Sequence, residues 1–473
     1  MPRAGPYSSL EVTRMRRWNR REFLAATLAL GGCATPGEPP LGPIYRPTHS
    51  TVDQPPLIVI PGAFGSSLRD RRTGREVWPG SDRRLLVSNY RNLELDIDPE
   101  TLEPVTGDVE AYEIFREGLG RDFYGRVVDV LGSAGGYVPL APGQAVPDGR
   151  RGYYVYLYDW RLDNVTAVRG LHALIEVIRA SAGDPALKVD ILAHSNGGLL
   201  ARYYARYGTA ALTDSGPFSP DNAGAAAIRR LLLVGTPNLG TLQPVLSLLR
   251  GEEMALRSVP QEVVATCPGA PQLMPHPAVT WAVDTDGAPF DRSLFDVGTW
   301  QANEWALWDA RVAARTVARH GGGAAGRAYL ATLRAYFAKH LVRGGRFMES
   351  LAAAGTDGET SAWVFGGDCE PTIARLVCER DDGRWEARER VEDIARRRAG
   401  VDYQALMFEA GDAVVTRSSL LGRLTRNVAA PRNGLESMPL AHAVFLCESH
   451  QQLTGNASFQ DNLLNVLLSA DPG

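Results

Sequence analysis

Short apolar runs alternate with amphipathic segments along the first half of the chain. Four runs, 57–60, 153–158, 189–192 and 231–234, are continuous aliphatic or aromatic stretches bounded by turn-forming residues, a pattern typical of strands buried on both faces. Between the second and third runs, the apolar residues of 168–178 recur at helical spacing. This alternation predicts an α/β fold in which helices cover both faces of a mostly parallel sheet. In such sheets, ligands bind at the carboxyl ends of the strands.

The alternation stops between about residues 240 and 355. Residues 305–341 are rich in Ala and Arg and predict a helix that is interrupted by the three glycines 321–323. Four of the nine tryptophans of the chain gather in this stretch: Trp281, Trp300, Trp305 and Trp308. Two interpretations stay open: an insertion with a small core of its own, and a cap whose apolar inner face contacts substrate.

Further along, the strand and helix patterns return. The runs 405–408 and 443–446 predict two more strands, and residues 459–468 predict a helix. The stretch 381–398 is dense in charge and predicts a solvated helix rather than a binding site.

Ser195 stands where the run 189–192 meets a helical segment. Ala193-His194-Ser195-Asn196-Gly197 has the small-x-Ser-x-Gly spacing of a nucleophile elbow, a tight strand-to-helix turn that exposes the serine hydroxyl. Both ends of this turn must be small because the backbone doubles back, and Ala193 is a weaker match than the usual glycine. The alternative is a serine that caps the helix. The position between a strand and a helix favours the nucleophile.

A serine nucleophile needs a base and an acid that orients the base. In α/β-hydrolases these partners follow the serine in the order acid, then His. Five histidines follow Ser195: His276, His320, His340, His442 and His450. The first three lie in the interrupting stretch, and His442 opens the predicted strand, which favours a structural role. His450 follows that strand in a loop and is the predicted base, whereas His194 is interpreted as a packed neighbour of Ser195.

Two aspartates compete for the role of the acid. Asp412 and Asp368 each follow a glycine near the end of an apolar run, where a carboxylate can turn toward an imidazole. Each could instead satisfy backbone N–H groups in a turn, the commoner role of Asp beside Gly. From spacing alone, both aspartates stay open.

An oxyanion in ester cleavage needs two backbone N–H donors. We expect one from Asn196, after the nucleophile, and one from the turn 62–65, through Ala63 or Phe64. This glycine-rich turn lacks the Lys and Ser/Thr of a phosphate-binding loop. No recognisable metal-ligand spacing occurs either, so we expect neither a metal nor a cofactor.

Residues 1–32 predict an export signal. Asn19-Arg20-Arg21-Glu22-Phe23-Leu24 fits the twin-arginine pattern, and the apolar segment 23–30 is shorter than the ~20 residues of a membrane span. Leu30-Gly31-Gly32-Cys33 resembles the bacterial lipoprotein box, whose cysteine is lipidated after cleavage; an ordinary signal peptide with an incidental cysteine is the alternative. Residues 33–54, rich in Pro and Gly, predict a tether. We therefore expect a periplasmic or cell-surface lipoprotein anchored in a bacterial membrane.

Composition fits a single large body over residues 55–473 and no nucleic-acid partner. The formal net charge is −4 for the whole chain, and loss of residues 1–32, with six Arg and two Glu, lowers it to −8. Besides Cys33, the chain has four cysteines, Cys267, Cys369, Cys378 and Cys447, which allow three pairings. Pairing of Cys369 with Cys378 closes most easily, and free thiols are equally open.

Four further stretches occur in one order across residues 56–470: Pro61–Leu68 (PGAFGSSL), Tyr158–Arg161 (YDWR), Gly235–Gly240 (GTPNLG) and Gly411–Ser418 (GDAVVTRS). They resemble the P-G-x-L-G-[NS]-x-L, Y-D-W-R, G-[AT]-P-x-x-G and G-D-x-T-V-x-x-x-S motifs of the lecithin–cholesterol acyltransferase family. That family includes phospholipid–diacylglycerol acyltransferases and the lysosomal phospholipase. His450 is similar in position to the histidine of the family.

The resemblance implies an α/β-hydrolase fold with a cap at about 240–355 and a lid at about 72–105. It implies Asp412 rather than Asp368 as the acid and Ala63 as the second oxyanion donor. Val414 departs mildly from the motif, and the cysteines of the family's lid are absent. Trp78 is therefore open to two interpretations, an apolar lid tip or a packed residue.

The resemblance also implies a substrate class, acyl esters of lipids, cleaved through a Ser-linked acyl intermediate. The acyl group then passes to an alcohol, as in an acyltransferase, or to water, as in a lipase or phospholipase. A polyester hydrolase is a further alternative. The complete Ser195, Asp412 and His450 set argues against a non-catalytic scaffold.

Overall fold

The computed structural model describes residues 40–50, 54–354, 358, 360–424 and 437–469. The expected export signal and the expected lipidation of Cys33 lie outside the described residues.

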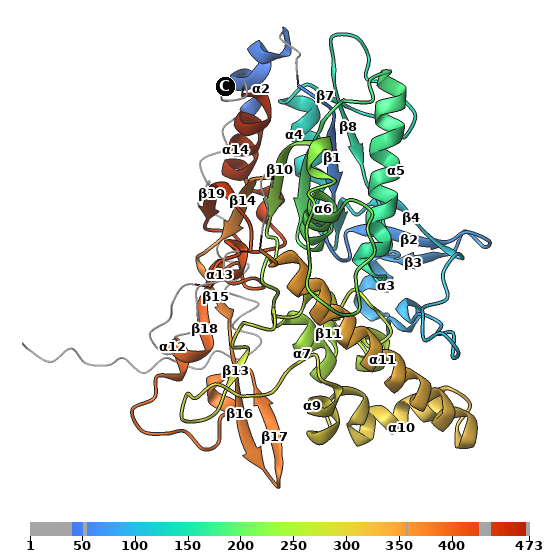
Figure 1. The fold of residues 1–473 in the computed structure, drawn as a ribbon, viewed down its shortest axis with the longest axis vertical. Coiled ribbons are helices and arrows are strands. Elements are labelled where there is room, and N and C mark those ends of the chain that lie inside the picture. Colours follow the sequence, from blue (N-terminus) through green and yellow to red (C-terminus); the bar gives the residue numbers. More distant parts are fainter. Residues whose placement is uncertain (1–39, 51–53, 355–357, 359, 425–436, 470–473) are drawn as a thin grey trace, which may run out of the picture. The chain divides into compact units, whose positions relative to one another are not determined.

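Seven parallel strands form the central sheet, in the order β19-β14-β10-β9-β1-β8-β7 (Figure 1). Their bounds are β1 Leu57–Ile60, β7 Tyr137–Pro139, β8 Arg151–Val155, β9 Val189–His194, β10 Ile228–Val234, β14 Ala362–Gly367 and β19 Leu440–Leu446. The strand order reverses at β1, since β7 and β8 lie on one side of it and all later strands lie on the other. A reversal of this kind leaves a crevice at the carboxyl ends of the strands. The predicted mostly parallel sheet is confirmed.

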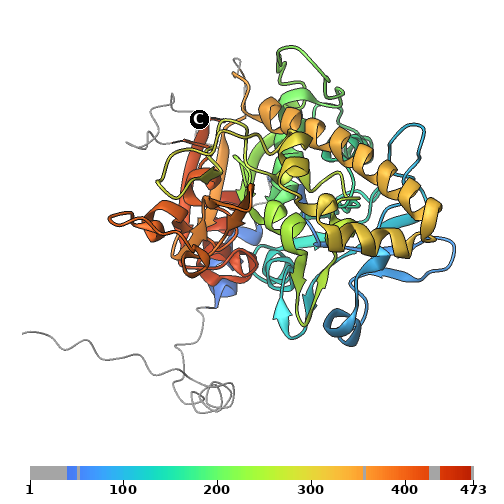
Figure 2. The ribbon, with the colours of Figure 1, turned by 90° about the horizontal axis from the view of Figure 1, so that it is seen from below.

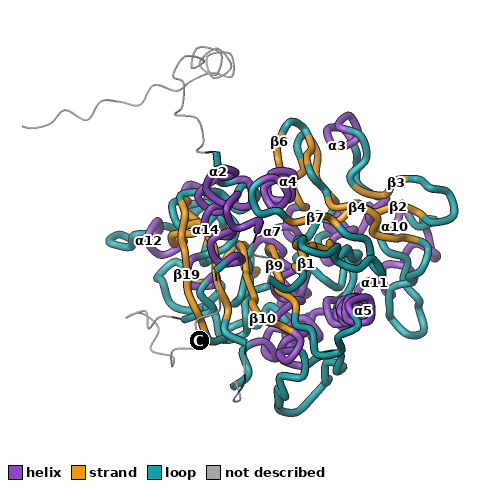
Figure 3. Tube along the Cα trace, turned by 90° about the horizontal axis from the view of Figure 1, so that it is seen from above, coloured by secondary structure: helices purple, strands orange, loops and turns teal. Residues whose placement is uncertain are grey.

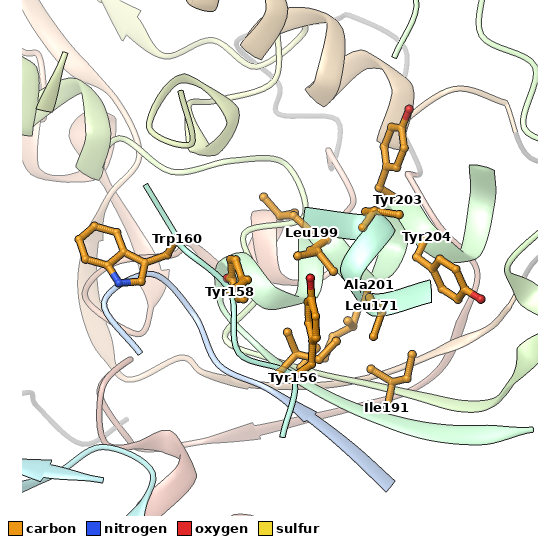
Figure 4. Packing of buried hydrophobic residues seen from close by; sticks show 14 of the residues in the cluster. Tyr156, Tyr158, Trp160, Leu171, Ile191, Leu199, Ala201, Tyr203 and Tyr204 are labelled. Carbon is orange, nitrogen blue, oxygen red and sulfur yellow. The ribbon is translucent and has the colours of Figure 1, made fainter. Parts of the chain in front are cut away.

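Helices cover both faces of this sheet, as the continuous apolar runs require. In β1, Leu57 and Val59 belong to one core, and Ile58 and Ile60 belong to the other. The first core includes α4 (Gly125–Ser133) and α14 (Ala457–Leu468), which lie across the sheet from α5 (Asn164–Ala182) in Figure 3. The second core joins α5 to α6 (Asn196–Tyr207), and Figure 4 shows Leu171, Ile191 and Leu199 among the packed side chains of this core.

A largely helical region is inserted along the chain between β10 and β14, which are neighbours in the sheet; its helices are yellow-green to orange in Figure 2. Its helices are α7 Gln243–Arg250, α8 Gln261–Val264, α9 Val297–Ala302, α10 Ala310–Arg319 and α11 Gly323–Leu351. The helix break occurs as predicted, because Gly321, Gly322 and Gly323 all have positive φ, between 43° and 89°. Trp281, Trp300 and Trp305 are buried in a cluster of their own beside the main sheet, so the tryptophans build a local core.

Smaller elements surround these layers. The strands are β2 Ser66–Asp70, β3 Glu76–Trp78, β4 Val109–Ile114, β5 Glu117–Gly118, β6 Arg121–Asp122, β11 Glu252–Met254, β12 Arg257–Val259, β13 Ala282–Val283, β15 Glu370–Ile373, β16 Leu376–Asp381, β17 Arg384–Arg388 and β18 Phe408–Gly411. The helices are α2 Leu41–Tyr45, α3 Asp82–Val87, α12 Tyr403–Met407 and α13 Arg417–Leu420. Within the described residues, no helix has the length and hydropathy needed to cross a bilayer.

Two local predictions are wrong. The charged stretch 381–398 contains the end of the β16–β17 hairpin instead of a helix, because Asp382 and Gly383 both have positive φ and form a two-residue turn. Most of 405–408 belongs to α12 rather than a strand, because the Asp402 carboxylate accepts a hydrogen bond from the Ala405 N–H and caps that helix.

The predicted tether also needs correction. Within it, residues 41–50 form α2 and a 3-10 turn, and both Leu41 and Tyr45 are buried. The Tyr45 hydroxyl donates a hydrogen bond to the Asp461 carboxylate on α14 at 2.7 Å. This part of the chain therefore packs against α14.

One disulfide joins the described segments. It links Cys369, between β14 and β15, to Cys447 at the end of β19, whereas Cys267 and Cys378 are free. The pairing of Cys369 with Cys378 is therefore wrong. Spatial proximity across two neighbouring parallel strands decides the pairing, despite a sequence separation of 78 residues.

Candidate active site

Ser195 occupies a strained turn between β9 and α6. Its φ of 53° is rare for a residue with a side chain. The turn is tightly packed: a Cβ at Gly197 would lie 2.6 Å from the carbonyl oxygen of Pro61, and a Cβ at Gly62 would lie 2.7 Å from the Cβ of Ser195. Ser195 stands at the N-cap of α6, yet its hydroxyl makes no capping bond. The helix-capping alternative therefore does not describe this serine.

The side chains of Ser195, His450 and Asp412 form one hydrogen-bonded chain. The Ser195 Oγ lies 3.0 Å from the His450 Nε2, and the His450 Nδ1 lies 2.8 Å from the Asp412 Oδ2. Only 8% of His450 is exposed, and Asp412 is fully buried. The structure thus brings together Ser195, His450 and the aspartate that the family resemblance implied.

Backbone groups hold the Asp412 carboxylate in place. Its Oδ1 accepts hydrogen bonds from the N–H groups of Val414 at 3.0 Å and Val415 at 2.6 Å. The backbone N–H of His450 donates to the carbonyl oxygen of Asp412 at 2.8 Å. The acid and the base are therefore joined through both their side chains and their backbones.

The rival residues lie elsewhere. Asp368 forms an ion pair with Arg417 at 3.4 Å, and His442 is an exposed residue of β19 whose ring packs against Trp363. His276, His320 and His340 lie in the helical region, as predicted.

His194, next to the nucleophile, does not contact the Ser195 hydroxyl. Its Nδ1 pairs with the Tyr124 hydroxyl at 2.7 Å, and its Nε2 pairs with the carbonyl oxygen of His450 at 3.3 Å. Burial, with a smaller effect of the nearby His450, lowers the pKa of His194 to about 3. This imidazole therefore stays neutral at ordinary pH.

The two expected oxyanion donors flank the serine. Ala63 belongs to the turn after β1, and Asn196 begins α6. Within the described residues, neither amide N–H donates to a backbone carbonyl. Ala63 lines the cavity beside Ser195, and the role of the two amides as oxyanion donors stays a prediction.

Buried polar side chains hold the Asn196 end of this site. The Asn196 and Asn164 amides exchange two hydrogen bonds of 2.9 Å, and the Asn196 Nδ2 also donates to the Tyr158 hydroxyl at 3.1 Å. Tyr158 in turn donates to the carbonyl oxygen of Pro61 at 3.0 Å. The sequence singled out Tyr158 only as part of a motif, and it gave no local signal for Asn164 or Tyr124.

Aromatic rings pack around residues 62–65, the turn that is expected to supply an oxyanion donor and is called the oxyanion turn below. The Phe64 ring lies 4.1 Å from the Trp160 ring and 5.2 Å from the Trp78 ring, centroid to centroid. The Trp78 Nε1 donates to the carbonyl oxygen of Phe64 at 2.8 Å, and Trp78 is only 3% exposed. Trp78 is thus packed against the turn, which favours the packed residue over the apolar lid tip, the two interpretations that the sequence left open. The assignment of residues 72–105 as a lid stays a prediction.

A largely apolar cavity of about 650 Å³ opens beside Ser195 and His450, within the usual size range of ligand sites. Its lining includes residues 63–65, residues between Trp78 and Phe123, and residues between Pro237 and Leu273. Although all four tryptophans between 281 and 308 are described, none lines the cavity. Other apolar residues of the 240–355 stretch do line it, among them Met254, Val263 and Leu273, which favours the cap interpretation for this part of the stretch and a local core for the tryptophans.

A few charged groups interrupt the apolar lining: Arg121, Glu252 and Glu253. Glu252 accepts hydrogen bonds from Gln243 and Ser247, and burial raises the pKa of its carboxyl group. Within the described part of the chain, no cluster of three or more His, Cys, Asp or Glu side chains could hold a metal ion.

Comparison with solved structures agrees with this architecture. A chain in the crystal structure of the Tle4–Tli4 complex aligns with a TM-score of 0.52 at 15% identity, over 88% of this chain and 98% of that chain. The α/β-hydrolase fold is defined by a parallel sheet with a nucleophile at a strand-to-helix turn, followed along the chain by an acid and a histidine. Ser195, Asp412 and His450 have this arrangement here. The chain has the α/β-hydrolase fold. At 15% identity, this likeness concerns the fold alone.

No protein-family model matches the chain, and no curated protein matches it. Membership of the lecithin–cholesterol acyltransferase family therefore stays a prediction from the motifs.

Proposed function

We propose that this α/β-hydrolase is a Ser-dependent acyl-ester hydrolase or acyltransferase that acts on lipid esters. The observation that carries the proposal is the hydrogen-bonded chain from Ser195 through His450 to Asp412, with Ser195 and His450 lining a largely apolar cavity. An apolar cavity of about 650 Å³ suits an acyl chain. The ordered motifs that resemble the lecithin–cholesterol acyltransferase family also favour lipid esters.

In the proposed reaction, the Ser195 Oγ attacks the ester carbonyl carbon while the His450 Nε2 takes the hydroxyl proton. Asp412 fixes the imidazole through Nδ1 and stabilises its positive charge. The N–H groups of Ala63 and Asn196 hold the oxyanion. Collapse of the intermediate breaks the ester bond, and His450 gives its proton to the departing alcohol, which leaves an acyl group on Ser195.

The second half of the reaction needs an acceptor for the acyl group. An alcohol gives a new ester, and water gives a free fatty acid; in both cases His450 takes the proton of the acceptor and Ser195 is regenerated. Transfer to an alcohol rests on the family resemblance alone, and the sequence does not separate it from transfer to water. A lipase, phospholipase or polyester hydrolase that uses only water is the alternative.

An acceptor assay tests this choice. Phospholipid vesicles are mixed with a labelled long-chain alcohol or sterol, and free fatty acid is separated from ester product. We expect a labelled ester from the wild type and neither product from Ser195→Ala. Fatty acid alone would restrict the protein to hydrolysis.

We also propose that the protein is an exported lipoprotein anchored through Cys33. The Cys369–Cys447 disulfide supports an oxidising compartment. Metabolic labelling with a palmitate analogue should mark the wild type but not Cys33→Ala, and equal labelling of both proteins would contradict the anchor.

A further inference from the structure

Three segments of the site meet at one pair of side chains, Tyr124 and His194, which also line the cavity. The oxyanion turn contributes Gly62, and the turn around Ser195 contributes His194. The loop after β19 contributes the backbone of His450. Tyr124, at the start of α4, connects the first of these segments to the second. The proposed chemistry assigns no role to Tyr124 or His194.

The hydrogen bonds of this pair run in a single direction. The Gly62 N–H can only donate, so the Tyr124 oxygen accepts from it at 2.8 Å. The phenol proton is then directed to the His194 Nδ1 at 2.7 Å. The remaining ring proton of His194, on Nε2, faces the carbonyl oxygen of His450, which can only accept. The neighbours thus define one neutral tautomer of His194.

We propose that Tyr124 and His194 are positioning residues that hold the oxyanion turn at a fixed place relative to the base, an inference that rests on the proposed acyl transfer. Tyr124 occupies the N–H of Gly62, so that the next amide along the turn, that of Ala63, is left to face the oxyanion. The turn is closed by a hydrogen bond from the Gly65 N–H to the carbonyl oxygen of Gly62 at 3.1 Å.

The turn 62–65 is packed closely against Ser195, which restricts the orientation of its amides. A Cβ at Gly62 would lie 2.7 Å from the Cβ of Ser195 and 3.2 Å from the His194 Nδ1. The turn therefore has almost no room to shift without changing the distance between its amides and the serine. Oxyanion donors act only when they are aimed at the developing charge in advance.

The neutral state of His194 serves the same purpose. When His450 takes the serine proton, it becomes a cation whose ring centre lies 4.9 Å from that of His194. Burial and the charge of His450 lower the pKa of His194 to about 3, so His194 does not add a second positive charge beside it. Because Tyr124 occupies Nδ1, His194 is also not an alternative base for Ser195.

Kinetics of four variants test the pair, with the full-length protein and a soluble long-chain ester. Tyr124→Phe removes one oxygen atom, and His194→Leu removes both hydrogen bonds of the ring. In His194→Gln, the amide oxygen can accept from Tyr124 while the amide nitrogen donates to His450. Tyr154→Phe is the matched control, because Tyr154 is a buried tyrosine that donates to the carbonyl oxygen of Gln144 at 2.5 Å and does not line the cavity.

We expect kcat to fall about 10- to 100-fold in Tyr124→Phe and His194→Leu, less than the ~10²–10³-fold typical of losing an oxyanion donor outright. KM should change less than about threefold, and a trifluoromethyl ketone, which forms a tetrahedral oxyanion adduct with Ser195, should bind more weakly by the factor lost in kcat. His194→Gln should recover most of the loss, and Tyr154→Phe should keep the wild-type kcat.

The outcomes separate the two proposals. A wild-type kcat in both Tyr124→Phe and His194→Leu would overturn the positioning role while leaving the proposed function intact. An equal loss of kcat in Tyr154→Phe would also overturn it. The same holds for a loss of kcat that only accompanies a lower melting temperature, with the ketone affinity unchanged. A wild type that neither cleaves the ester nor binds the ketone would remove the proposed function itself.

Discussion

At the scale of single residues, the acid of the proposed triad is defined by what each of its oxygens contacts. One oxygen of Asp412 faces the His450 Nδ1, and the other accepts two backbone N–H groups. The carboxylate is therefore oriented before any substrate arrives. Asp368, its rival in the sequence, instead faces Arg417.

Replacing this acid should reduce turnover while the fold persists. In Asp412→Asn the amide favours the wrong tautomer of His450, and we expect kcat to fall by about 10⁴-fold. Steady-state kinetics with an ester substrate, together with circular dichroism, measure this. Asp368→Asn is the matched control and should retain activity. Comparable losses in the two variants would argue against Asp412 as the acid.

The sequence predicted the residues of the triad but not the residues that support them. Ser195 stands in an elbow motif, His450 was chosen for its place in a loop after a predicted strand, and the family resemblance decided for Asp412 over Asp368. Tyr124 contacts His194 across 70 residues, and Asn164 contacts Asn196 across 32. Such contacts depend on how the strands are arranged, so they cannot be predicted from residue spacing along the chain.

At the scale of elements, strands with long apolar runs were predictable, and elements decided by turns or caps were not. The strand β9 and the helix α14 follow from hydrophobic pattern. The β16–β17 hairpin depends on the Asp382-Gly383 turn, and α12 depends on the Asp402 cap. The charge density of 381–398 and the apolar run 405–408 therefore led to wrong predictions.

The Cys369–Cys447 disulfide is a covalent link between elements, because it joins the end of β14 to the loop that carries His450. Its removal in a Cys369→Ser, Cys447→Ser double variant should lower the free energy of unfolding by about 2–5 kcal/mol. Urea unfolding, with and without a reductant, measures this. A reductant should weaken the wild type to the same degree and leave the double variant unchanged. Cys378→Ala is the control, and it should keep the sensitivity to reductant.

The cavity wall offers a second test at the element scale. Leu273 lines the cavity, so Leu273→Trp should shorten the usable space and shift the preference toward short acyl chains. In the wild type, kcat/KM should rise up to about fourfold for each methylene taken into the cavity, from ~0.8 kcal/mol per buried methylene. A series of p-nitrophenyl esters measures the slope. Val342→Trp, at an exposed position of α11, should behave as wild type, and an unchanged slope in Leu273→Trp would contradict the assignment of the cavity.

At the scale of the whole molecule, buried histidines link stability to pH. Burial lowers the pKa of His194 to about 3 and that of His276 to about 4, whereas both take up protons near pH 6.5 in the unfolded chain. Below that pH the unfolded state binds more protons than the folded state, so stability falls as the pH is lowered.

We expect the free energy of unfolding to decrease between about pH 6 and pH 4.5, by up to ~1.4 kcal/mol per pH unit for each of these histidines. Urea unfolding at several pH values measures the slope, and His194→Gln should reduce it. Equal stability at pH 7 and pH 5 would contradict the burial of neutral histidines.

The central claim is that Ser195 is a nucleophile activated by His450 and Asp412. Mass spectrometry of the protein after exposure to a long-chain p-nitrophenyl phosphonate tests it most directly. We predict one phosphonyl adduct, on the peptide that contains Ser195, with no adduct in Ser195→Ala and strongly slowed labelling in His450→Ala. A wild type that stays unmodified, or an adduct that persists in Ser195→Ala, would contradict the account.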